Sequence, residues 1–111
     1  MKVFLSELAE SKLLKLNDYL LENWNLKTRD RFIEKLSEKM KQISIQPQSC
    51  PESSEFKGLY KCVVTKQTTF YYRVSTELRE VEVLTIFDTR QNPDKLKKEI
   101  WYKSTKAQHR V

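Results

Sequence analysis

The sequence has a single glycine, Gly58, and a single histidine, His109. A phosphate-binding loop needs several glycines so that its backbone can approach the phosphates, and one glycine excludes such a loop. Nucleophilic hydrolases commonly depend on a histidine base, and a lone histidine near the end of a sequence is usually only an exposed side chain. P-loop proteins and histidine-dependent hydrolases are therefore disfavoured.

Cysteine is also scarce, and Cys50 and Cys62 have neither the CxxC spacing nor the neighbouring histidines of a zinc site. We expect two free thiols, with Cys62 packed as a small hydrophobe, and neither a metal nor a cofactor. No apolar run approaches the roughly 18 residues of a membrane-spanning helix. Because the acidic Glu7 comes too early for a signal peptide, we expect a cytoplasmic protein without membrane contacts.

The positive charge is confined to one half of the chain. Residues 1–56 contain nine Lys and Arg against nine Asp and Glu, whereas residues 57–111 contain twelve against six, which accounts for the whole net charge of +6. A balanced half is typical of a solvated scaffold. A basic half is a candidate contact surface for a phosphate backbone or an acidic protein partner.

Two segments of the first half have the apolar spacing of amphipathic helices. The first begins after Ser6, a suitable N-cap, and ends near residues 23–25. The second is predicted over residues 27–43, with apolar residues on one face and paired charges on the other. Two such helices joined by a short break predict an antiparallel hairpin.

The second half is dominated by β-forming residues. It predicts strands over residues 59–65, 69–75 and 80–87, joined by short polar turns. A further short strand is predicted over residues 3–5, and a short final helix over residues 94–102.

These elements predict one α+β domain over residues 1–111, with a core of about residues 3–96 and a tail over residues 97–111. The order is β-α-α-β-β-β with a short C-terminal helix. We expect the helix hairpin to pack on one face of a twisted, mainly antiparallel sheet. The opposite face is expected to be partly open and to carry the basic residues.

Cations and aromatic residues alternate on the predicted strands. Residues two apart share a face, so Tyr71 and Arg73 should point one way and Phe70 and Tyr72 the other. A ring and a guanidinium on the open face suit RNA, because unstacked bases lie on such planes while lysines hold phosphate. The alternative is that these tyrosines belong to the core and Arg73 is a surface charge. The candidate site residues are Arg73, Arg90, Lys61 and Lys57 for phosphate chemistry, and Tyr71 and Lys66 for substrate binding.

Residues 70–74, FYYRV, and residues 81–93, VEVLTIFDTRQNP, together resemble the RelE/ParE superfamily of bacterial toxins. These are the small toxins of type II toxin–antitoxin modules, also known as plasmid stabilisation proteins. The resemblance extends to the helix pair and to residues 56–60, so that it covers about residues 3–96. The order of elements inferred above is also the order of that fold.

The resemblance implies a toxin that a separate antitoxin neutralises. RelE-like members cleave mRNA in the ribosomal A site without metal, whereas ParE-like members inhibit DNA gyrase and are not enzymes. Arg90 matches the arginine that follows the last strand, and Arg73 lies on a strand where RelE-like nucleases place another. Lys57 and Lys61 lie in the region of their catalytic lysines. Leu96 stands where some of these nucleases have a tyrosine, and Tyr102 and His109 come later.

Three functions follow as hypotheses. In a ribosome-dependent endoribonuclease, Arg73 and Arg90 would stabilise the phosphate, Lys57 or Lys61 would assist proton transfer, and Tyr71 would stack on a base. The missing tyrosine favours a gyrase inhibitor instead, and the third hypothesis is an inactive basic RNA-binding or interaction module. For either toxin, we expect an antitoxin with an acidic, partly disordered segment, and a hetero-oligomer formed with it.

Overall fold

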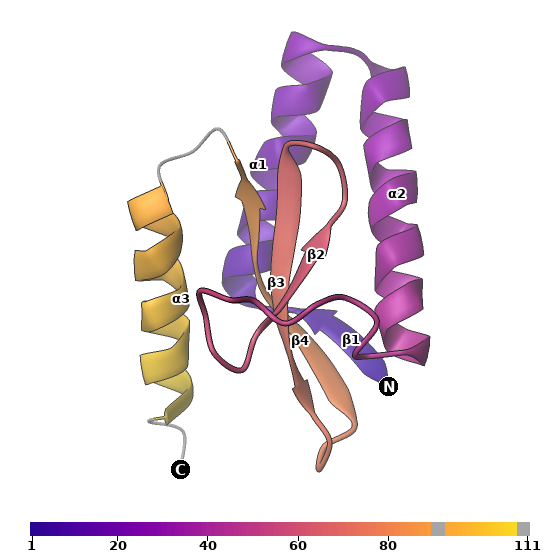
Figure 1. The fold of residues 1–111 in the computed structure, drawn as a ribbon. Coiled ribbons are helices and arrows are strands. Elements are labelled where there is room, and N and C mark those ends of the chain that lie inside the picture. The colour runs from indigo at the N-terminus through magenta and orange to yellow at the C-terminus, as the bar shows by residue number, and fades with distance from the viewer. Residues whose placement is uncertain (90–92, 109–111) are drawn as a thin grey trace.

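The computed structural model describes residues 1–89 and 93–108 of the chain, including the side chains of residues 1–89 and 94–101. It contains a strand, two helices, three strands and a third helix (Figure 1): β1 Lys2–Leu5, α1 Glu7–Asn23, α2 Leu26–Ile45, β2 Tyr60–Val63, β3 Thr68–Ser75, β4 Glu80–Asp88 and α3 Pro93–Gln108. The predicted α+β class and order of elements are confirmed. The third helix is longer than the predicted one, and β2 is shorter than its predicted strand.

Both helices of the hairpin begin at a side-chain cap. The Ser6 hydroxyl accepts a hydrogen bond from the Ala9 amide at 3.1 Å and donates one to the Leu84 carbonyl at 2.6 Å. The Asn25 side chain accepts from the Thr28 amide at 2.8 Å. Each cap satisfies a backbone donor that the helix itself leaves unpaired, and Ser6 also fixes α1 to β4.

The four strands form one sheet in the order β1-β4-β3-β2. The β3 strand is antiparallel to both β2 and β4, while β1 runs parallel to β4. The β3–β4 register shifts between Tyr71 and Tyr72: Tyr71 lies opposite Thr85, Tyr72 lies opposite Val83, and Leu84 between them has no partner. Such a bulge changes the alternation of side chains, so that Leu84 and Phe87, three residues apart, both pack on the same side.

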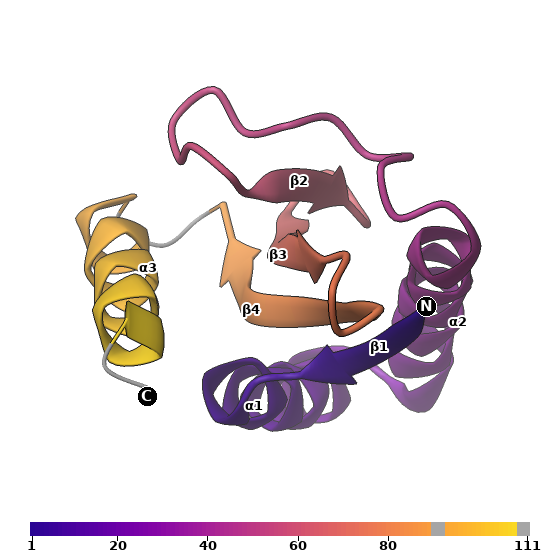
Figure 2. The same ribbon diagram turned by 90° about the horizontal axis from the view of Figure 1, so that it is seen from below.

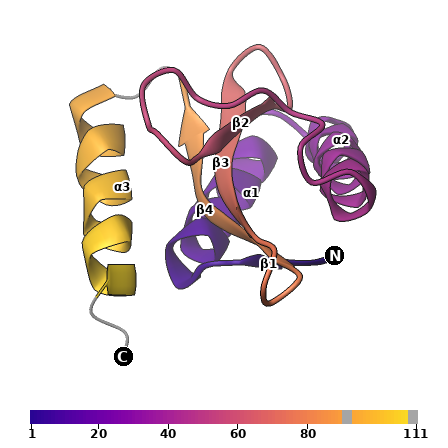
Figure 3. The ribbon, with the colours of Figure 1, turned by 60° about the horizontal axis from the view of Figure 1, so that its bottom comes forward.

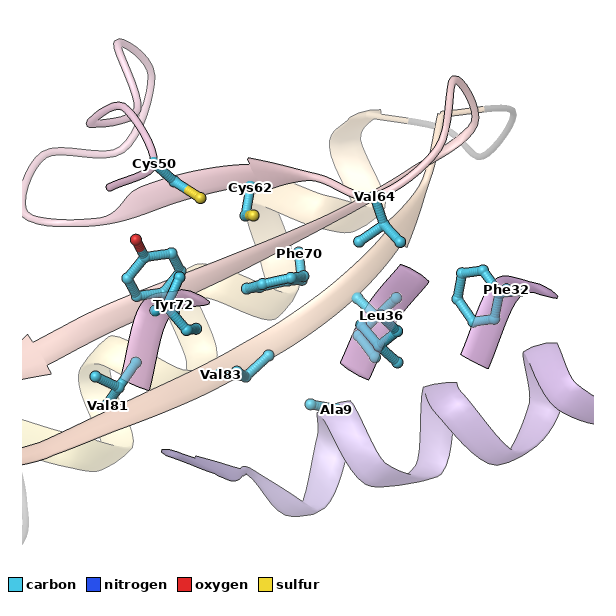
Figure 4. Close-up of a cluster of buried hydrophobic side chains, with 12 residues drawn as sticks. Ala9, Phe32, Leu36, Cys50, Cys62, Val64, Phe70, Tyr72, Val81 and Val83 are labelled. Atoms are coloured by element: carbon cyan, nitrogen blue, oxygen red, sulfur yellow. The ribbon is translucent and has the colours of Figure 1, made fainter. Parts of the chain in front are cut away.

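The helix hairpin packs on one face of the sheet, which we call the hairpin face. Its core joins Phe32, Leu36 and Ile43 of α2 to Phe70 and Tyr72 of β3 (Figure 4). The Tyr72 ring stacks on Tyr60 at a centroid distance of 5.2 Å, and its hydroxyl donates to the Pro47 carbonyl at 2.7 Å. A large aromatic side chain is thus buried with its polar atom satisfied.

The opposite face, which we call the α3 face, is covered by α3 and by part of the connection between α2 and β2. This connection crosses toward α3 before it turns into β2, as Figures 2 and 3 show. Leu96 and Ile100 of α3 pack with Leu84, Phe87 and Tyr71 of the sheet and with residues of the connection. The prediction of a partly open face is therefore wrong around Tyr71, because α3 is long enough to reach across β4.

None of the helices in residues 1–89 and 93–108 has an apolar stretch long enough to cross a bilayer.

Candidate functional site

Tyr71, predicted to stack on an RNA base, lies in the core of the α3 face. Its side chain is 4% exposed, and the Phe56 ring packs edge-on against it at a centroid distance of 5.6 Å. Burial raises the pKa of the Tyr71 hydroxyl above its ordinary value, and the negative charge of Glu55 raises it further. A ring enclosed in this way has no free face for a base, which favours the alternative that Tyr71 belongs to the core.

Arg73 lies two residues farther along β3, where its guanidinium is held by a carboxylate. It faces Glu82 across the β3–β4 ladder, and its Nη2 and Nε atoms lie 2.7 and 2.9 Å from Glu82 Oε1. The Glu82 side chain is 17% exposed and that of Arg73 is 40% exposed. A phosphate would have to compete with Glu82 for this cation, which reduces its value as a phosphate-binding group.

The three candidate lysines are exposed but distributed along the molecule. Lys57 lies in the connection before β2, Lys61 lies on β2 opposite Tyr71, and Lys66 lies in the turn between β2 and β3. At roughly 3.3 Å per residue along a strand, Lys66 is on the order of 20 Å from Arg73. Lys66 and Arg73 are therefore not within reach of one phosphate group.

The remaining candidates lie beyond the described part of the chain. Arg90 and His109 are outside the described residues, and Tyr102 belongs to α3 with its side chain outside the described part.

Gly58 shapes the connection that covers Tyr71. Its φ angle of +84° lies in the left-handed region that glycine adopts readily. The turn is closed by a 3.1 Å hydrogen bond from the Leu59 amide to the Phe56 carbonyl. The single glycine of the sequence thus serves a turn that brings Phe56 onto the Tyr71 ring.

A part-buried ion pair, not predicted from the sequence, fixes α3 to the rest of the domain. Lys12 Nζ of α1 lies 2.8 Å from Glu99 Oε1 of α3, with the two side chains 13% and 12% exposed. Lys12 also donates to Glu99 Oε2 at 3.0 Å, and the Thr85 hydroxyl of β4 donates to the same oxygen at 3.1 Å. One carboxylate therefore joins three elements that are far apart in the sequence.

Beside this ion pair lies an open groove of about 480 Å³, which we call the basic groove. Three elements line it, and its residues are Lys12, Lys15, Leu16 and Tyr19 of α1, Ile86 and Asp88 of β4, and Lys95 of α3. The groove joins α1, from the half with balanced charge, to β4 and α3 of the basic half, so charge alone indicates only part of its lining. The signal in the sequence is the spacing of Lys12, Lys15 and Tyr19, which places them along one side of a helix.

The cysteines lie together in the core of the hairpin face (Figure 4). Both are buried free thiols. The prediction of two free thiols, with Cys62 packed as a small hydrophobe, is confirmed. Burial raises the pKa of Cys62 to about 12, and a hydrogen bond with Cys50 contributes in the same direction. A thiol that stays protonated is a poor nucleophile and metal ligand. Within the described residues, no three His, Cys, Asp or Glu side chains are grouped to hold a metal.

The arrangement of a helix hairpin, a four-stranded sheet and a C-terminal helix is that of a RelE/ParE-like toxin. The structure described as the chromosomal ParDE toxin–antitoxin system from P. aeruginosa has a TM-score of 0.66 to this chain, at 17% identity over 79% of this chain and 95% of that one. The YoeB/ParE toxin from Agrobacterium tumefaciens has a TM-score of 0.57, at 18% identity over 79% of this chain and 98% of that one. At such identities, the likeness shows the fold.

The sequence matches the family model described as the ParE toxin of type II toxin–antitoxin system, parDE, over residues 3–93. Since this match spans most of the chain, the chain belongs to that family, and the predicted membership of the RelE/ParE superfamily is confirmed. It is the toxin of a ParDE-type toxin–antitoxin system, and the family implies an antitoxin as its partner. Among curated proteins, none is significantly similar in sequence.

Proposed function

We propose that this toxin acts as a ParE-like inhibitor that binds DNA gyrase, without cleaving RNA. The observation that carries the proposal is the covered α3 face, where Tyr71 is buried beneath Phe56 and α3. A metal-independent nuclease must direct several donors and cations at one phosphate. Arg73 is held by Glu82 and Lys66 lies in the β2–β3 turn, so these two cations do not converge on one phosphate. An inhibitor that acts by binding needs no such convergence.

The test is a supercoiling assay with purified gyrase, relaxed plasmid and ATP. We expect a molar excess of the toxin to stop supercoiling, and the antitoxin encoded beside it to restore the reaction. A toxin heated until it unfolds is the control for non-specific inhibition. Normal supercoiling in the presence of excess folded toxin would contradict the proposal.

Ribosome-dependent mRNA cleavage is the second candidate, favoured by the exposed lysines Lys57, Lys61 and Lys66. In that case Arg73 and Arg90 would stabilise the phosphate, and message on programmed ribosomes would be cut at excess toxin. Intact message together with inhibited gyrase would reject this candidate. An inactive module, the third possibility, would leave growth unaffected when the chain is expressed without its antitoxin.

A further inference from the structure

We propose that the basic groove is a docking site for a segment of the antitoxin in which acidic side chains flank apolar ones. The apolar side chains would lie on Leu16 and Tyr19, and the carboxylates would pair with Lys15 and Lys95. The proposal rests on the toxin–antitoxin function, since it names the partner surface of the same protein. It does not depend on which target the toxin inhibits.

The dimensions and the lining of the groove fit a few side chains of a peptide. Its volume of about 480 Å³ lies within the usual range for ligand sites, roughly 300–1,000 Å³. Leu16 of α1 is half-buried and supplies apolar surface, whereas Ile86 of β4 is almost fully buried and adds little. The Tyr19 ring, with the residue 39% exposed, lies beside them and offers an aromatic surface for a partner side chain.

The groove is lined by three lysines and by one carboxylate, Asp88 of β4, and the lysines differ in whether a partner already neutralises them. Lys12 is paired with Glu99, so its charge is largely compensated. Lys15 and Lys95 are exposed and form no ion pair or hydrogen bond with the residues that the structure describes. They lie on α1 and α3, and a bound segment with two carboxylates can therefore contact both helices at once.

An acidic peptide fits this lining better than a nucleic-acid backbone. The sugar–phosphate chain would satisfy the two lysines but would offer no apolar contact to the half-buried Leu16. A segment with alternating apolar and acidic residues satisfies both kinds of surface, and electrostatic attraction also speeds its association. Disordered acidic segments that order on a partner can bind in this way.

The walls of the groove are fixed before any partner binds. Glu99 connects α3 to α1 through Lys12 and to β4 through the Thr85 hydroxyl. The lysines Lys15 and Lys95 are therefore presented on elements that are already fixed in place. Preorganisation of this kind reduces the entropic cost of binding.

The first test measures the affinity of the toxin for the product of the neighbouring reading frame, after the two are purified as a complex and separated. Lys15→Glu/Lys95→Glu should weaken binding by about 30-fold, because two attractions become repulsions. The matched control Lys35→Glu/Lys41→Glu carries the same change of charge on exposed positions of α2 and should bind normally. Lys15→Arg/Lys95→Arg should also bind normally, and the 30-fold effect should shrink at high salt.

A second measurement needs no variant of the toxin. Lysine acetylation followed by mass spectrometry should show Lys15 and Lys95 protected in the complex with the antitoxin and reactive in the free toxin. Lys35 and Lys41 should react equally in both states, which controls for the concentration of reagent.

Unchanged affinity of Lys15→Glu/Lys95→Glu, with both amines still reactive in the complex, would overturn the proposal. So would loss of gyrase inhibition at normal antitoxin affinity, because the groove would then bind the target. Protection of both lysines by RNA but not by the antitoxin would overturn it as well. A wild-type toxin that binds its antitoxin through these lysines but leaves gyrase active would instead reject only the proposed gyrase function.

Discussion

The two faces of the sheet are covered by different means. On the hairpin face, the two longest helices enclose a core of twelve buried residues, from Ala9 to Ile86. On the α3 face, one helix and part of a connection enclose six of the described side chains, and a part-buried ion pair supplements them. Because stabilisation by burial grows with the apolar area removed from water, the hairpin face should supply most of the stability.

This difference suggests a division of roles between the faces. The core of the hairpin face supplies most of the packing of the sheet. On the α3 face, fewer of the described apolar side chains are buried, and the Lys12–Glu99 ion pair adds to their effect. Regions with fewer buried contacts open at lower free energy than the rest of a domain. We therefore expect α3 to be the first element to separate from the sheet, and the following predictions test this comparison.

The largest effect is expected for Phe70→Ala in the hairpin face. Phe70 is fully buried, and removing its ring should cost about 3–5 kcal/mol of unfolding free energy in transfer and cavity terms. Ile100→Ala on the α3 face should cost only about 2 kcal/mol, the lower end for such a truncation. Urea unfolding gives both values, and hydrogen exchange should rise throughout the domain in the first variant but mainly in α3 in the second. Equal costs would remove the distinction between the faces.

The Lys12–Glu99 ion pair should stabilise the folded domain only while both charges are present. Glu99→Gln removes the negative charge that Lys12 contacts at 2.8 Å and should cost about 2 kcal/mol, since the part-buried ammonium loses the carboxylate that pairs with it. The double variant Lys12→Met/Glu99→Leu should recover most of this loss, because no unpaired charge is left. Thermal unfolding of the single and double variants measures the coupling. Lys15→Met, which removes an exposed lysine of the same helix, is the control.

A smaller effect is expected in the connection that covers Tyr71. Gly58→Ala places a Cβ atom where no neighbour lies within 4 Å, so the φ angle of +84° is the only source of strain. The cost of a left-handed residue is about 1–2 kcal/mol. Gly58→Asn should cost less, since asparagine tolerates this conformation. An alanine variant as stable as the wild type in urea would show that the turn contributes nothing.

The sequence was sufficient for the elements that repeat a local pattern. Apolar spacing predicted both helices of the hairpin, and Ser6 was correctly predicted as the first cap. The β-forming runs predicted the three later strands. A periodic pattern predicts an element because the spacing of its apolar residues shows which face of that element is buried.

The α3 face could not be predicted in the same way, because its contacts join residues that are distant in the sequence. Lys12 and Glu99 are 87 positions apart, and neither stands in a local pattern that indicates pairing. Leu96 and Ile100 lie on one side of α3, but the neighbouring Trp101 is exposed, so the apolar residues of this stretch do not mark a single face. The bulge at which Leu84 lacks a partner on β3 is also not indicated by the residues around it.

The last prediction concerns alkaline pH, and it tests how closely the hairpin face is packed. Burial raises the pKa of Cys62 from 9.0 to about 12. Between these values the folded chain keeps a proton that the unfolded chain loses, so this stability is present below pH 9 and is lost as the pH rises toward 12. Unfolding free energy should therefore fall by up to about 1 kcal/mol between pH 8 and pH 10.

Urea unfolding at the two pH values measures this loss, and Cys62→Ala should show less of it. The window stays at or below pH 10 because burial also raises the pKa of Tyr71 on the other face, and of Tyr72 in the same core, above 10.0, so that both tyrosines begin to contribute at higher pH. Alkylation of Cys62 by iodoacetamide should be slow in the folded protein at pH 8, since the reactive thiolate is scarce. Rapid alkylation of Cys62, together with a urea midpoint that does not change with pH, would show that solvent reaches the core of the hairpin face.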